Sequence, residues 1–141
     1  MKTLRLYTDG AARGNPGPAG LGVVIEDDGG QRLAGRYRYA GITTNNQAEY
    51  LALIDGLTAM REWRPSRLEV YMDSELVVRQ LQGRYKVKNA ELLPLHQRAR
   101  RLLEEFGEYS LAHVERARNK GADALANRAI DEWQAAGKGK I

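Results

Sequence analysis

Four acidic residues stand where strands and helices are expected to begin or end. Asp9 and Asp73 each end a stretch of alternating apolar residues that predicts a strand, and Glu49 and Asp123 fall in the first turns of predicted helices. In an open sheet, ligands gather beyond the carboxyl ends of the strands. If the carboxylates meet there, a pair about 4 Å apart repels by about 4 kcal/mol at an effective dielectric constant near 20. Such a cluster requires divalent cations, or protons on some of its members.

All-oxygen ligands of this kind suit Mg²⁺ or Mn²⁺ rather than zinc. Two such ions ~3.5–4 Å apart would support in-line displacement at a phosphate. The chain has no cysteine and only His96 and His113, which excludes a thiolate site and argues against a multi-histidine zinc site. Spacing alone leaves a second interpretation open, in which Asp9 before Gly10 is a turn residue and Asp73 is a helix cap.

Length and composition indicate one globular domain. The chain has 141 residues, of which 43% are hydrophobic and 28% charged, and its net charge is +4. We place the domain at 1–136 and a short flexible tail at 137–141. The mild positive charge is compatible with a polyanionic partner but does not prove one. No leader pattern and no run of ~18 apolar residues is visible, so we expect a cytoplasmic protein that does not enter a membrane, and a monomer.

The elements that must position the acids predict an α/β fold. Apolar alternation and turn signals predict strands at 4–8, 21–26, 32–40, 68–73 and 111–114. Helical spacing predicts helices at 47–62, 73–81, 90–106 and 122–135, the third kinked by Pro94. Three strands linked by short turns form an antiparallel meander, and the last two alternate with helices. We therefore expect a mixed five-stranded sheet, a three-stranded meander plus two parallel strands, flanked by helices.

Four runs in the sequence carry a family resemblance: YTDGAARGNPGPAGLGVVI, TTNNQAEYLALIDGL, VYMDSELVVRQL and NKGADALANRA. In this order they resemble type 1 ribonuclease H over nearly the whole chain. The resemblance implies the ribonuclease H-like fold and endonucleolytic hydrolysis of the RNA strand of RNA/DNA hybrids, giving 5′-phosphate and 3′-hydroxyl ends. It implies that Asp9, Glu49, Asp73 and Asp123 are the catalytic acids and hold two Mg²⁺ ions, for which Mn²⁺ can substitute.

The resemblance also implies that Gly10, Asn15, Asn45 and Asn46 bind the substrate. Amides can donate to and accept from the RNA 2′-hydroxyl, which distinguishes RNA from DNA. The same residues suit structural roles, because Asn15 precedes Pro16 in a turn and either later asparagine can cap a helix. The two roles can coexist.

The stretch 83–89 departs from the family pattern. Many bacterial members carry a helical basic protrusion here, and this stretch leaves no room for one. Lys86 and Lys88 are the candidates for the phosphate contacts that remain.

The loop before Asp123 also departs from the pattern, because bacterial members place a mobile histidine there. His113 falls in a strand pattern instead, so we expect the loop histidine to be missing. Arg116 or Arg118 could serve as a fixed cation near the leaving phosphate. Both arginines could equally contact only solvent or the nucleic-acid backbone.

Three functions fit the sequence. The favoured one is a divalent-metal-dependent ribonuclease H. The alternatives are a catalytically silent module that binds hybrids or double-stranded RNA, and a nuclease of the same fold with another substrate. The four acids argue against a silent module, since binding needs no metal site, and the TNN motif favours the hybrid.

Overall fold

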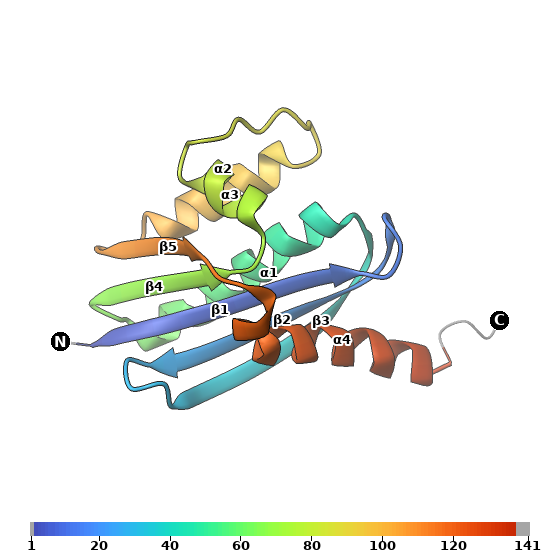
Figure 1. The fold of residues 1–141 in the computed structure, drawn as a ribbon, viewed down its shortest axis with the longest axis horizontal. Coiled ribbons are helices and arrows are strands. Elements are labelled where there is room, and N and C mark those ends of the chain that lie inside the picture. The colour runs from blue at the N-terminus through green and yellow to red at the C-terminus, as the bar shows by residue number, and fades with distance from the viewer. Residues whose placement is uncertain (1, 138–141) are drawn as a thin grey trace.

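The computed structural model describes residues 2–137 and contains one five-stranded sheet with helices on both faces (Figure 1). The strands are β1 (Thr3–Ala12), β2 (Gly17–Asp27), β3 (Arg32–Thr43), β4 (Arg67–Met72) and β5 (Tyr109–His113). Their order is β3-β2-β1-β4-β5. Strands β1, β2 and β3 pair antiparallel, whereas β4 runs parallel to both β1 and β5. The predicted mixed sheet is confirmed, while the predicted tail beyond Gly137 lies outside the described residues.

Helices cover the sheet unequally. They are α1 (Asn45–Met60), α2 (Glu75–Leu81), α3 (Leu93–Leu103) and α4 (Lys120–Ala135), with 3₁₀ turns η1 (Arg61–Trp63) and η2 (Arg116–Arg118). Figure 1 shows α1, α2 and α3 on one face and α4 on the other, over β2 and β3. Within the described part of the chain, no helix combines the length and apolar character needed to cross a membrane.

The core lies between the sheet and α1. Tyr50, Leu53, Leu57 and Met60 recur at helical spacing, and all four are fully buried. They join a cluster that includes alternate residues of the central strands, such as Leu6. The apolar spacing therefore determines which face of α1 packs on the sheet. It thereby also determines that Glu49, near the start of α1, lies on the side of the sheet.

Strand β1 is longer than predicted. Its pairing with β2 extends to Ala12 opposite Ala19, so Asp9 lies inside the strand and not at its end. The acid is nevertheless at the end of the parallel pairing, because β4 ends at Met72 opposite Thr8. Asp73 then follows directly, so the two acids come just after the last paired residues of β1 and β4 and lie side by side.

The prediction for the third helix was wrong at its start. Residues 82–92 form turns and no helix, and α3 begins at Leu93 with Pro94 in its first turn. Proline suits this position because its missing N–H would have no partner there, so no kink arises. The absence of a helical protrusion between α2 and α3 is as predicted.

The start of α4 is pressed against the sheet. A Cβ atom at Gly22 of β2 would lie 2.0 Å from the carbonyl oxygen of Ala122, so only glycine permits this approach. Asp123 is the next residue, in the first turn of α4. The close packing that Gly22 permits thereby places Asp123 near Asp9 of the neighbouring strand β1.

Candidate active site

Three of the four predicted acids meet at one point. Asp9, Glu49 and Asp73 each offer a carboxylate oxygen, and these oxygens all lie within 4.8 Å of one another. The Asp123 carboxyl is close enough to that of Asp9 for a hydrogen bond between them. Four carboxyl groups from β1, α1, α4 and the end of β4 therefore converge, which is the arrangement that the family resemblance implied and that spacing alone had left open.

Two local details differ from the predictions. Because α1 begins at Asn45, Glu49 lies beyond its first turn, which contains no acid. Asp73 is not the cap of α2, since Ser74 is the N-cap and its side chain accepts from the N–H of Val77 at 3.3 Å. The interpretation of Asp73 as a plain helix cap is therefore wrong.

Burial and mutual repulsion disfavour charge on the two innermost acids. Burial, followed by the nearby Asp73 and Asp123 carboxyls, raises the pKa of Asp9 to about 8. Burial, with repulsion from Asp9 and Asp73, raises the pKa of Glu49 well above its ordinary value. The positive charge of Arg116 opposes both shifts. Without cations, the cluster must therefore retain protons near neutral pH.

The donor set fits divalent cations. Among the ion pairs of residues 2–137, none involves any of the four acids, so no side-chain cation neutralises the cluster directly. Oδ2 of Asp73 is buried and has no hydrogen-bond partner in the described structure. A buried carboxylate oxygen without a donor is costly unless a cation or water meets it. An all-oxygen set of this kind matches Mg²⁺ or Mn²⁺.

Gly10 joins β1 to α1 at the acids. Its N–H donates to Oε1 of Glu49 at 3.1 Å. A Cβ atom at this position would lie 2.1 Å from the backbone of Ala48, so the helix could not approach any other residue type. The structure thus gives Gly10 a packing role, and its N–H already has a partner inside the protein.

The acid pocket has a volume of about 380 Å³ and opens to solvent beside the start of α1. Besides three of the acids, its lining includes Gly10, Asn45 and Arg116. A polar pocket of about 460 Å³ also involves the start of α1, and its lining includes Asn15, Asn45 and Asn46. Asn45 lines both pockets, which makes them neighbours.

The three predicted amides lie together at the start of α1. Oδ1 of Asn15 accepts from the N–H of Asn45 at 3.0 Å, and Oδ1 of Asn45 accepts from the N–H of Ala12 at 3.1 Å. Neither Asn45 nor Asn46 caps the helix, because Thr44 is the N-cap and forms a capping box with Gln47. The asparagines therefore tie the β1–β2 segment to α1.

The two arginines of η2 face different pockets. Arg116 lines the acid pocket, whereas Arg118 lines a separate small pocket with Tyr7 and Glu26. His113 is the last residue of β5 and is exposed, as the strand pattern predicted. Of the three candidates for a cation at the acids, the structure brings only Arg116 into the pocket lining.

Two further asparagines, which were not predicted as site residues from the sequence, lie beside the acids. Nδ2 of the buried Asn119 donates to the carbonyl of Thr8 at 3.0 Å, directly before Asp9. Nδ2 of Asn127 donates to the carbonyl and to Oδ1 of Asp123, at 3.0 and 3.3 Å. Each lies four residues from Asp123 in the run NKGADALANRA. Residues at this spacing are neighbours on a helix, so the spacing could have predicted that both asparagines lie near Asp123.

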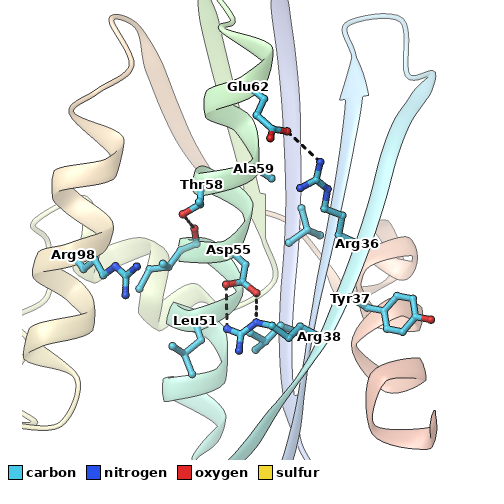
Figure 2. A pocket seen from close by; sticks show the side chains of 12 residues that line it. Arg36, Tyr37, Arg38, Leu51, Asp55, Thr58, Ala59, Glu62 and Arg98 are labelled. Carbon is cyan, nitrogen blue, oxygen red and sulfur yellow. Dashed lines mark hydrogen bonds and ion pairs between the residues drawn. The ribbon is translucent and has the colours of Figure 1, made fainter. Parts of the chain in front are cut away.

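A groove of about 460 Å³ lies between α1, α3 and strands β2 and β3 (Figure 2). Arg36, Arg38 and Arg98 line it, but none of the four acids does. Arg38 forms a two-pronged contact with Asp55 at 2.9 and 3.1 Å, and Arg36 pairs with Glu62 at 3.4 Å. The groove contains none of the four acids, and Asp55 and Glu62 already pair with two of its three arginines. It is therefore not the candidate active site.

Comparisons with known proteins agree with this geometry. A family profile described as "Reverse transcriptase-like" matches residues 7–129. Ribonuclease HI of Halobacterium salinarum is 45% identical over 126 residues, which are 89% of this chain and 63% of that protein. Ribonuclease H of Verminephrobacter eiseniae is 34% identical over 160 aligned positions, covering 100% of this chain and 97% of that one.

Solved structures show the same likeness. The crystal structure of LC11-RNase H1 in complex with RNA/DNA hybrid superposes with a TM-score of 0.88 at 45% identity, over 92% of this chain and 97% of that one. The chain spans less than two thirds of several of these relatives: it covers 63% of the Halobacterium protein and 35% of a Mycobacterium tuberculosis protein described as bifunctional.

Proposed function

The chain belongs to the type 1 ribonuclease H family, and on that premise we propose that it is an endoribonuclease acting on RNA/DNA hybrids. It would hydrolyse the RNA strand and leave 5′-phosphate and 3′-hydroxyl ends. The observation that carries this proposal is the convergence of Asp9, Glu49 and Asp73 within 4.8 Å, with Asp123 beside them. The LC11 relative that was solved with an RNA/DNA hybrid supports the choice of substrate.

The four acids are proposed to hold two Mg²⁺ ions, with Mn²⁺ as a substitute. When bound, such ions would activate water and stabilise charge at the leaving 3′-oxygen. Asp73 suits this role because its buried Oδ2 lacks a donor, and Asp9 and Glu49 suit it because their charge needs a counter-ion.

The protein's own groups set the geometry of these acids. The N–H of Gly10 holds the carboxylate of Glu49 in place through one of its oxygens. The parallel register of Thr8 with Met72 places Asp9 beside Asp73. Rigid strand and helix positions of this kind reduce the reorganisation needed during the reaction. We assign Arg116 as a fixed cation that faces the reacting phosphate from the rim of the pocket.

Asn15, Asn45 and Asn46 are proposed to contact the hybrid, with Gly10 near them. The three amides line the pocket that neighbours the acids, so a duplex lying across both pockets would present its RNA 2′-hydroxyls to them. The internal hydrogen bonds of Asn15 and Asn45 hold those amides in place before substrate arrives. The cytoplasmic location, the monomeric state and the domain limits stay predictions from the sequence.

The test is a cleavage assay on labelled RNA/DNA, RNA/RNA and DNA/DNA duplexes with Mg²⁺ or Mn²⁺, using wild-type protein and Asp9→Asn. We expect the wild-type protein to cut the RNA strand of the hybrid, to leave 5′-phosphate ends, and to lose this activity in Asp9→Asn. Cleavage that persists in the variant would exclude the mechanism. Binding of the hybrid without cleavage would instead identify a silent binding module.

A further inference from the structure

One face of α4 carries a line of polar residues that starts at the fourth acid. Asp123, Asn127, Asp131 and Gln134 follow one another at spacings of four, four and three, so they share a face of the helix. Arg13, in the segment between β1 and β2, lies along this line. Its Nη2 is 2.7 Å from Oδ1 of Asp131, and its Nη1 donates to Gln134 at 3.1 Å.

Asn127 connects Arg13 with Asp123. Oδ1 of Asn127 accepts from Nη2 of Arg13 at 3.2 Å, and its backbone carbonyl accepts from the same nitrogen at 3.4 Å. Nδ2 of Asn127 donates to Oδ1 of Asp123 at 3.3 Å. An asparagine amide has one accepting and one donating end, so a cation at the oxygen turns the NH₂ group towards the acid. Arg13 thereby sets the orientation in which Asn127 meets Asp123.

Asp123 is less enclosed than the two innermost acids, so its carboxylate needs a restraint that theirs do not. It lies outside the three-acid group and is only half-buried, whereas Asp9 and Glu49 are at most 9% exposed. Its carboxyl also faces that of Asp9. Repulsion between like charges favours rotation of the more exposed carboxylate into solvent. A donor fixed to one oxygen of Asp123 opposes that rotation.

We propose that Asn127 is a positioning residue for hybrid cleavage. Its amide, oriented by Arg13, holds one carboxylate oxygen of Asp123 and leaves the other oxygen for the acid pocket. The inference rests on the proposed function, in which Asp123 helps to hold a divalent cation. Asn127 acts through Asp123 and does not touch the substrate.

A purely structural role for Asn127 makes a different prediction. Its bond to the carbonyl four residues earlier is a common feature of helices, and by itself it affects only helix stability. Outer contacts that orient a metal ligand change metal affinity and activity, with losses of about ten- to a hundredfold when they are removed. The two roles therefore separate in cation affinity and in kcat.

The experiment compares wild type, Asn127→Ala, Asn127→Asp and the matched control Asp131→Ala, which removes another partner of Arg13 from the same face. Mn²⁺ binding is measured by calorimetry on protein without nucleic acid, kcat and KM are measured on the hybrid, and melting temperature checks folding. We expect Asn127→Ala to weaken Mn²⁺ binding and to lower kcat by about tenfold each, with KM within about twofold. Asn127→Asp should lose more, because it places a like charge beside Asp123, and Asp131→Ala should match wild type.

Unchanged Mn²⁺ affinity and kcat in Asn127→Ala would overturn the proposal and leave only the helix contact. Equal losses in Asp131→Ala would also overturn it, since general anchoring of α4 would then explain the effect. If the wild-type protein does not cleave the hybrid, the proposed function fails. The Mn²⁺ affinities of the variants still decide the role of Asn127 in that case.

Discussion

The backbone N–H of Gly10 donates to Oε1 of Glu49 at 3.1 Å, and this bond joins the strand and the helix that supply two of the four acids. Only glycine fits at this position, because the backbone of Ala48 occupies the space where the Cβ atom of any other residue would lie. The geometry of the acids thus depends on how closely α1 approaches β1.

Replacing Gly10 with alanine tests this approach. A Cβ atom 2.1 Å from the Ala48 backbone must push α1 away, so we expect Gly10→Ala to lower the free energy of unfolding by about 3 kcal/mol and to reduce cleavage. Denaturant titration measures the stability. Gly107→Ala is the control, because a Cβ atom at Gly107 meets nothing within 4 Å, and its effect should stay within about 0.5 kcal/mol. Equal stability of the two variants would contradict the close approach.

Asp9→Asn should preserve or raise the melting temperature when no cation is present. The substitution keeps the shape of the side chain and removes a charge that burial and the neighbouring acids disfavour. Differential scanning calorimetry in EDTA checks this, with Asp28→Asn in the exposed β2–β3 turn as the control. A clear fall in the melting temperature of Asp9→Asn alone would count against a crowded acid cluster.

The pKa of Asp9 also gives the cation-free protein a dependence on pH. The group has a pKa of about 8 when folded and an ordinary value of 3.8, so between these values the folded state binds more protons than the unfolded state. Stability from this group is therefore present below about pH 4, is lost as the pH rises towards 8, and stays level above that.

The measurement is the difference in unfolding free energy between wild type and Asp9→Asn from pH 4 to pH 9 in EDTA. We expect wild type to lose stability relative to the variant across this range. Saturating Mn²⁺ should abolish the loss, because bound cations favour the ionised carboxylate. A difference that is independent of pH in EDTA would refute the raised pKa.

Arg116→Ala should lower kcat on the hybrid by about tenfold or more, because the side chain lines the acid pocket and carries a permanent positive charge that acts on Asp9. Arg118→Ala and His113→Ala should stay within about twofold, since Arg118 lines another pocket and His113 is an exposed strand residue. Steady-state kinetics decides the matter. If only the histidine variant loses turnover, our assignment of this loop is wrong.

Asn46→Ala should lower kcat/KM on the hybrid about fivefold, the effect of losing one neutral hydrogen bond of about 1 kcal/mol. Asn46 lines the amide pocket at the start of α1. Gln97→Ala, on an exposed position of α3, is the control. If Asn46→Ala weakened binding to a DNA/DNA duplex as much as binding to the hybrid, Asn46 would contact the nucleic-acid backbone and would not recognise the 2′-hydroxyl.

Local patterns in the sequence determined most of the fold. The spacing of Tyr50, Leu53, Leu57 and Met60 predicted the buried face of α1, because a helix repeats every 3.6 residues whatever its surroundings. Apolar alternation predicted the strands in the same way, because successive side chains of a strand point to opposite faces of the sheet. The four acids were also visible, since Asp9 and Asp73 end predicted strands and Glu49 and Asp123 lie near the starts of predicted helices, each within one of the four motifs.

Contacts between distant segments decided the rest. Arg116 and Arg118 are two residues apart, and only the course of η2 against the sheet and α4 brings the first to the acids. Arg13 lies 114 positions before Asn127, and only the packing of the β1–β2 segment against α4 brings the two side chains together. Sequence periodicity encodes which face of an element is buried, but the partner of a polar side chain depends on how the elements pack together.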